Sequence, residues 1–231
     1  MAKRTFGVIG LGRFGAAMAT TLAQLGHDVT GVDGDEDKVR AVADLISLAM
    51  QLDATDEKAL RAAGIKDVDV AVVSIGENIE SSLLVVTLLR EIGIKQIVAK
   101  AVTALHGRIL EKLGVSRVVF PEREMAIRVA HGLVMPNVLD YIELSSEFSI
   151  VEVPAPHEFV GKTLREIGLR ARFGLTTIAI KHSPKNGLVT LANIAPGPDD
   201  VIQAGDVLSL LGHNERLGQL ETMMKRAALP D

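Results

Sequence analysis

Three glycines near the start of the chain, Gly10, Gly12 and Gly15, have the spacing G-x-G-x-x-G. The apolar run Thr5 to Ile9 before them is predicted to be a strand, and a helix is predicted to open at Ala16. In this setting the glycines permit a tight turn, close approach of a pyrophosphate to the backbone, and close packing of helix on strand. Free amides and the positive end of the helix dipole attract the anion. The segment therefore predicts a phosphate-binding turn.

A carboxylate, Asp33, ends the second apolar run. In dinucleotide-binding folds an acid about 20 residues beyond the glycines accepts hydrogen bonds from the ribose hydroxyls of adenosine. It also repels a 2′-phosphate, and the acidic run Asp35 to Asp37 offers no arginine to attract one, so NADP is disfavoured. A glycine turn that merely packs tightly is the alternative, but it leaves Asp33 unexplained. The two features together predict a site for ATP, ADP or NAD(H).

The first 135 residues alternate short β-branched runs with amphipathic stretches, as expected of a parallel sheet with crossover helices. The predicted fold class is α/β, a Rossmann-like doubly wound parallel sheet with its ligand crevice at the carboxyl ends of the strands. The six predicted strands are Phe6 to Ile9, Val29 to Val32, Ser47 to Leu52, Val68 to Ser74, Ile97 to Ala99 and Val118 to Phe120. The helical stretches between them end at Gly26, Gly64, Gly93 and Gly114, where a positive φ is needed.

Two further segments are expected at this crevice. Asp53, Ala54 and Thr55 follow the third strand, where Asp53 borders the expected adenine pocket and Thr55 is a candidate helix N-cap. A polar loop after the fourth strand places Ile75 and Gly76 over the crevice, although a solvated connection accounts for this loop equally well.

Two basic residues are candidates for contact with phosphate. Arg13, which stands beside Phe14 inside the glycine turn, can fork onto phosphate oxygens. A cation in the first helical turn opposes the dipole unless an anion is bound. Lys100 leaves the fifth predicted strand and can neutralise phosphate charge, but a surface lysine that packs its stem on apolar groups is the alternative.

A domain boundary is predicted at Pro136-Asn137, which ends a predicted helix from Glu122 to Met135. Residues 1–137 form the nucleotide-binding domain, and residues 138–231 are predicted to form a second, smaller α+β domain. In the second domain we expect strands at Phe148 to Val153 and Thr177 to Ile180, and helices at Lys162 to Leu169 and Asn214 to Lys225.

The composition of the chain excludes several classes of protein. The 231 residues include no cysteine and carry a net charge of −4, with no cluster of basic residues to bind nucleic acid. The N-terminus does not have the pattern of a secretory signal, and the apolar runs are shorter than the roughly 20 residues of a membrane span. We therefore expect a cytoplasmic protein whose link to a membrane runs through a partner.

The chain resembles the regulator-of-potassium-conductance domains of the Ktr and Trk potassium uptake systems. The matching segments are Val8 to Gly15, Val32-Asp33, Asp53 to Thr55, Val98 to Ala101, Phe120 to Glu122, Tyr141 to Leu144, Gly161 to Leu164 and Val201 to Asp206. The resemblance implies a homo-oligomer, a cytosolic octameric ring built from dimers, on the inner face of the membrane. It implies binding of ATP, ADP or NAD(H) and control of a membrane potassium-translocating subunit.

The resemblance also assigns roles to residues. It implies that Arg13 approaches the terminal phosphate of ATP, and that Glu122 binds a divalent cation, Mg²⁺ or Ca²⁺, at the phosphates. A glutamate favoured at a helix start by the dipole alone is the alternative for Glu122. Some relatives bind cyclic di-AMP at the C-terminal domain, for which Leu164, Leu169 and Arg170 are candidates here. Apolar core positions and one surface arginine explain these three equally well.

Two other functions fit parts of the sequence. A NAD-dependent oxidoreductase uses the same glycine turn, but the sequence shows no reaction centre. Cysteine is absent, and the six histidines are scattered without a neighbouring acid–base partner pattern. A redox-sensing transcription regulator needs a basic helix-turn-helix segment, and none is visible. We therefore expect a regulator and not an enzyme.

Overall fold

The computed structural model describes residues 2–134, 138–182 and 191–227. The chain divides into two compact units, Met1–Arg123 and Glu124–Asp231. Pro136 and Asn137, on which the predicted boundary between 1–137 and 138–231 rests, lie outside the described residues. That boundary therefore stays a prediction.

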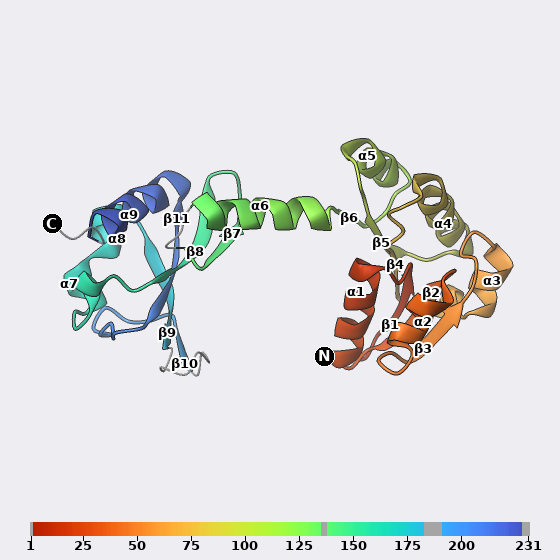
Figure 1. Cartoon of the computed structure of the whole chain (residues 1–231), viewed down its shortest axis with the longest axis horizontal. Helices are drawn as coiled ribbons and strands as arrows, with labels where there is room; N and C mark the ends of the chain where they lie inside the picture. Colours follow the sequence, from red (N-terminus) through yellow and green to blue (C-terminus); the bar gives the residue numbers. More distant parts are fainter. Residues whose placement is uncertain (1, 135–137, 183–190, 228–231) are drawn as a thin grey trace. The chain divides into compact units, whose positions relative to one another are not determined.

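The first unit contains six parallel strands in the order β3-β2-β1-β4-β5-β6 (Figure 1). Their bounds are Thr5–Ile9 (β1), Asp28–Asp33 (β2), Leu48–Gln51 (β3), Val70–Val73 (β4), Gln96–Lys100 (β5) and Arg117–Val119 (β6). Ile9 is in register with Val32 on one side and with Val73 on the other, so these strands end at the same edge. The strand order reverses at β1, which is where such a sheet opens its ligand crevice. The predicted doubly wound parallel sheet is confirmed.

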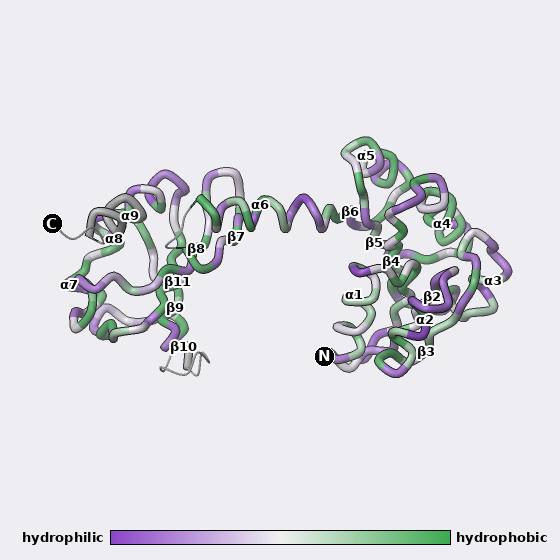
Figure 2. Tube along the Cα trace, viewed as in Figure 1, coloured by the Kyte–Doolittle hydropathy of each residue, from purple (hydrophilic) through white to green (hydrophobic). Residues whose placement is uncertain are grey.

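Helices cover both faces of this sheet. They are α1 (Arg13–Gln24), α2 (Glu36–Val42), α3 (Glu57–Ala62), α4 (Ile79–Ile92) and α5 (Ala104–Lys112), with a 3₁₀ turn at Ile65–Asp67. Val8 of β1 belongs to a buried cluster with residues of α1 and α2, whereas the next residue, Ile9, packs in a cluster with α3, α4 and α5. Since neighbouring residues of a strand point to opposite faces, each face has its own apolar core. The central strand β4 is buried throughout. Its apolar residues, Val70 to Val73, fall at the hydrophobic end of the colour scale in Figure 2.

The helix ends follow their capping chemistry with one correction. Gly26, Gly64, Gly93 and Gly114 all have positive φ, as predicted. The first helix, however, begins at Arg13 and not at Ala16. Gly12 takes the N-cap position in an extended conformation and makes no side-chain cap, so nothing in the sequence marks this start.

The second unit contains an antiparallel sheet in the order β10-β9-β11-β8-β7, which confirms a smaller α+β domain. The strands are Asp140–Glu143 (β7), Phe148–Pro154 (β8), Thr176–His182 (β9), Leu191–Ile194 (β10) and Val207–His213 (β11). The helices are α7 (Leu164–Ile167), α8 (Leu169–Phe173) and α9 (Asn214–Ala227), with a 3₁₀ turn at His157–Phe159. The side chains of Leu208 and Leu210 on the central strand β11 are fully buried.

One predicted helix of this unit is wrong in detail. The stretch from Lys162 to Leu169 is broken at Gly168, which adopts φ +65 and separates α7 from α8. Thr163 and Glu166 form a capping box that fixes the start of α7. The long helix α6 spans Pro121–Val134, one residue earlier at its start than predicted.

Candidate nucleotide-binding site

A cavity of about 670 Å³ opens at the carboxyl ends of the strands of the first unit. Its lining brings together segments that follow β1, β2, β3 and β4, as expected of a crevice at the reversal of strand order. The predicted site residues in this lining are Gly10, Gly12, Asp33, Asp53, Ala54, Thr55, Ile75 and Gly76. The volume lies within the range of small-molecule sites.

Each glycine of the turn has a distinct geometry. Gly10 has φ +92, a conformation that L side chains rarely adopt. A Cβ on Gly15 would lie 1.9 Å from the carbonyl oxygen of Gly10, so this position admits no side chain. Around Gly12, by contrast, a Cβ would meet no atom within 4 Å, so open space faces the backbone where a pyrophosphate is expected.

The first amides of α1 face no helical acceptor. The first helical hydrogen bond runs from the amide of Ala16 to the carbonyl of Gly12, at 2.8 Å. The amides of Arg13, Phe14 and Gly15 precede it, and such amides have no partner within their own helix. These three predicted residues do not line the cavity with side chains, but they supply the helix start that favours an anion.

Asp33 is held in place by two backbone amides. The Leu11 amide donates to Oδ2 at 2.6 Å, and the Asp35 amide donates to Oδ1 at 2.9 Å. An ionised carboxylate has about four acceptor positions, so lone pairs remain for ribose hydroxyls. The bond to Leu11 was not predicted, because it joins residues 22 positions apart.

Asp53 and Thr55 interact with each other in the cavity wall. Oδ1 of Asp53 accepts hydrogen bonds from the Thr55 hydroxyl at 2.7 Å and the Thr55 amide at 2.8 Å. These bonds, the hydroxyl first, hold the pKa of Asp53 below its ordinary value, so the group is ionised at neutral pH. The prediction of Thr55 as helix N-cap is wrong, because Asp56 caps α3 by accepting from the amides of Lys58 and Ala59.

Glu77 and Asn78 of the polar loop after β4 also line the cavity, as expected, whereas Lys38, Gln51 and Ser81 were not predicted as lining residues. Lys38 brings a positive charge to the end of the cavity near Asp33 and lies 3.7 Å from Asp35. Asn78 caps α4 by accepting from the Ser81 amide at 3.0 Å. The Asn78-x-x-Ser81 spacing before an apolar run is the signal that identifies this cap in the sequence.

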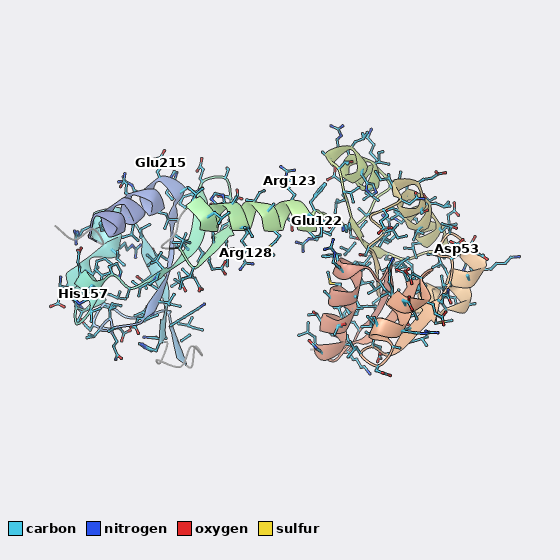
Figure 3. All side chains as sticks on the ribbon, in the orientation of Figure 1. Asp53, Glu122, Arg123, Arg128, His157 and Glu215 are labelled. Carbon is cyan, nitrogen blue, oxygen red and sulfur yellow. The ribbon has the colours of Figure 1, made fainter. Side chains whose placement is uncertain are left out.

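Lys100 and Glu122 form an ion pair beside the cavity. Nζ of Lys100 lies 2.5 Å from Oε1 of Glu122, and 3.4 Å from the position of a Cβ on Gly76. The pKa of Glu122 is lowered, first by the Lys100 hydrogen bond, then by its own backbone amide, and further by the charge of Arg13. Glu122 lies in the first turn of α6 (Figure 3). Although neither residue lines the cavity, Gly76 connects the pair to it.

The fit of a divalent cation to these residues is limited. Among the described residues no group of three His, Cys, Asp or Glu side chains is placed to hold a metal ion. Glu122 offers one carboxylate, which already contacts an ammonium group. A hard cation needs six or more oxygen ligands, so most would have to come from phosphates and water.

Comparison with known proteins identifies the family. Residues 6–121 match the TrkA-N domain, and residues 148–225 match the TrkA-C domain. The chain belongs to the TrkA-N/TrkA-C family. Its resemblance to regulators of potassium conductance is thereby confirmed.

The relatives of this TrkA-N/TrkA-C chain include potassium uptake proteins. The chain is 39% identical to Ktr system potassium uptake protein C of Bacillus subtilis over 95% of its own length and 96% of the relative. It is 30% identical to Ktr system potassium uptake protein A of Vibrio alginolyticus, over 93% and 94% of the two chains.

Solved structures share the fold of this TrkA-N/TrkA-C chain. The GsuK RCK domain has a TM-score of 0.63 at 20% identity, and the GsuK channel bound to NAD has 0.61 at 19% identity. Both cover 96% of this chain, which spans 48% and 40% of those chains. No helix among the described residues has the length and apolar character needed to cross a membrane.

Proposed function

We propose that this chain is a regulatory subunit of a membrane potassium-uptake system and that it responds to a bound adenine nucleotide. One observation supports this above the others. The cavity of about 670 Å³ joins the glycine turn to Asp33 in a chain that is 39% identical to a Ktr system potassium uptake protein over 95% of its length. By this proposal the chain binds the nucleotide to report its presence and does not transform it, which separates it from a NAD-dependent oxidoreductase.

The nucleotide lies across the carboxyl edge of the sheet. Asp33 accepts hydrogen bonds from the ribose, while the amides at the start of α1 bind the phosphates. The adenine lies toward Asp53 and Ala54, which line the same cavity. ATP, ADP and NAD(H) share this adenosine and pyrophosphate framework, and the GsuK channel, which shares the fold, has been solved bound to NAD.

Regulation follows from a difference in affinity. By this proposal Arg13, the first residue of α1, contacts a terminal phosphate that ATP has and ADP lacks. A ligand shifts a conformational equilibrium only by its difference in affinity for the two states. Nucleotides with equal affinities for both states would change nothing. A divalent cation, Mg²⁺ or Ca²⁺, is part of this proposal only as a bridge between the phosphates and Glu122.

Assembly is expected through exposed apolar surface. The helix α6 has no buried residue among those described, and Met125, Val129 and Leu133 on it are 55%, 52% and 79% exposed. Such a surface is costly in water and favours contact with a second copy. We propose a homo-oligomer, a dimer assembling to an octameric ring, that acts in the cytoplasm as a peripheral protein on the membrane partner.

A second effector site fits the C-terminal unit. A cavity of about 340 Å³ is lined by the three candidates for cyclic di-AMP, Leu164, Leu169 and Arg170. Arg170 supplies a charge for a phosphate, and the leucines supply apolar contact for a base. This proposal is independent of the nucleotide at the first unit.

The experiment identifies the ligand and the partner together. The purified full chain is titrated with ATP, ADP and NADH by calorimetry, and the copurifying ligand is identified by mass spectrometry. A pull-down then tests binding to a potassium-translocating membrane subunit from the same genome. We expect submillimolar binding and capture of that subunit in a nucleotide-dependent manner. No affinity for any of the three nucleotides at millimolar concentration would overturn the proposal.

A further inference from the structure

The Lys100–Glu122 ion pair lies beside Gly76, a residue of the nucleotide-cavity lining. Only 12% of the Lys100 side chain is exposed, against 70% for Glu122, so Lys100 is fixed while its partner is accessible. The ammonium lies beside Gly76, a lining residue of the cavity, 3.4 Å from where a Cβ on that glycine would be. Lys100 is therefore a cation available at the edge of the cavity, but already paired.

Arg13 acts on the same carboxylate. Its positive charge is the smallest of the contributions that lower the pKa of Glu122. Arg13 immediately follows Gly12, where the open space for a pyrophosphate is found. Lys100 is thus the direct partner of Glu122, and Arg13 adds only a weaker electrostatic attraction.

The distance across the sheet from Asp33 to Lys100 determines which nucleotides can reach the ion pair. Asp33 ends β2 and Lys100 ends β5, and β1 and β4 lie between them. Three strand spacings separate the two residues by roughly 14 Å. The first phosphate of any nucleotide stays beside the ribose, at the glycine turn. Only further phosphates extend toward β5.

We propose that Glu122 is a built-in competitor of the terminal phosphate: without a divalent cation, a nucleotide that reaches Lys100 must displace the Glu122 carboxylate from it. This inference rests on the proposed nucleotide site. It adds an explanation of how the protein distinguishes nucleotides by their number of phosphates. A monophosphate leaves the ion pair intact. A triphosphate replaces it and meets repulsion from the freed carboxylate.

The competition also links the ligand to α6. Glu122 is the second residue of that helix, so its bond to Lys100 fixes the start of α6 to the end of β5. When a phosphate takes over Lys100, this attachment is lost. The number of phosphates on the nucleotide is thereby converted into a change at the start of α6.

The test measures binding of ATP and AMP to the full chain by calorimetry in EDTA. Glu122→Gln keeps the shape of the side chain and removes its charge. We expect the affinity for ATP to rise ~three- to tenfold, the range of a partly buried ion pair, while the affinity for AMP changes less than about twofold. Glu122→Asp keeps the charge but shortens the reach to Lys100, and we expect an intermediate gain for ATP.

Two controls separate competition from general charge effects. Glu80→Gln removes the same charge from the first turn of α4, at an exposed residue outside the cavity lining. In a Lys100→Gln background, adding Glu122→Gln should raise ATP affinity less than it does in the wild-type background, because the contested cation is gone and only the repulsion between carboxylate and phosphate is relieved. Thermal melting verifies that each variant is folded.

The outcomes are distinct. An unchanged ratio of ATP to AMP affinity in Glu122→Gln, or an equal gain for ATP in Glu80→Gln, overturns the competitor role while the nucleotide site stands. A gain in the Lys100→Gln background as large as in the wild-type background overturns it as well. A wild-type chain that binds neither nucleotide contradicts the proposed function itself, and the competitor role with it.

Discussion

The amide of Leu11 donates a 2.6 Å hydrogen bond to Asp33, which ties the glycine turn after β1 to the end of β2. The other carboxylate oxygen accepts from the Asp35 amide, so the orientation of the group is fixed before any ligand arrives. Asp33 therefore has two roles in the proposed site. It positions the phosphate-binding turn and, by the proposed function, it accepts hydrogen bonds from the ribose.

The two roles predict the effect of Asp33→Ala. We expect it to weaken binding of ATP, ADP and NADH alike, by roughly tenfold or more, since a hydrogen bond to a charged group contributes about 1.5–3 kcal/mol. Titration calorimetry with the three nucleotides measures this. Asp37→Ala is the matched control, because it removes an exposed carboxylate in the first turn of α2. Unchanged affinity in Asp33→Ala would place the ribose elsewhere.

Gly12 and Gly15 are expected to respond differently to the same substitution. In Gly12→Ala the new methyl group meets no protein atom within 4 Å but occupies the space expected for a pyrophosphate. We expect the free energy of unfolding to stay within about 1 kcal/mol of wild type, while nucleotide affinity falls about tenfold or more. Denaturation without ligand and calorimetry with ATP measure the two quantities separately.

In Gly15→Ala the methyl group would lie 1.9 Å from a backbone oxygen, so the turn or α1 must move. We expect a loss of about 1–3 kcal/mol in the free energy of unfolding, together with loss of binding. The pair is therefore informative as a contrast. Equal destabilisation by both substitutions would contradict the geometry of the turn.

Arg13→Ala tests the terminal phosphate. We expect ATP affinity to fall roughly ten- to a hundredfold, as for a lost hydrogen bond between charged groups, and ADP affinity to fall less. Arg40→Ala is a suitable control, because it removes an arginine of α2 that pairs with Glu36 and does not line the cavity. Calorimetry that shows equal losses for ATP and ADP in Arg13→Ala would exclude a contact with the terminal phosphate.

The sequence predicted the sheet of the first unit well, because every strand except β3 is a short run with β-branched residues, and α1, α3, α4 and α5 are each followed by a glycine with positive φ. It misplaced the starts of α1 and α3 for local reasons. Gly12 caps α1 without a side chain. Before α3, Thr55 and Asp56 are both candidate N-caps, and the structure uses Asp56.

Contacts between residues far apart in the chain could not be predicted from the sequence. Lys100, the last residue of β5, is in register with Val119, the last residue of the neighbouring strand β6. Glu122 follows Val119 by three residues, which brings its side chain to Lys100. Register depends on the packing of the whole sheet, which no local pattern encodes. In the second unit, the central strand β11 was missed, and Gly168 divided a helix that periodicity had predicted as one.

A last prediction concerns pH and the pairing of β1 with β4. Asp69, just before β4, accepts hydrogen bonds from the amide of Thr5 at 2.7 Å and from its hydroxyl at 3.0 Å. These two bonds, the amide first, hold the pKa of Asp69 below about 3.9, the ordinary value for an aspartate. A carboxylate with a lowered pKa stabilises the fold above its unfolded pKa, and this contribution is lost as pH falls through the folded pKa.

We therefore expect Asp69→Asn to lower the melting temperature at pH 7, and the difference from wild type to shrink as the pH approaches 3. Asp67→Asn, at an exposed residue two positions earlier, serves as the control for a change of net charge. Scanning calorimetry of the three proteins between pH 7 and pH 3 gives the comparison. Because both partners lie at the starts of adjacent central strands, the bonded carboxylate holds the edge of the sheet opposite to the nucleotide cavity. A difference that stays constant with pH would show that the ionised form of Asp69 does not contribute to this pairing.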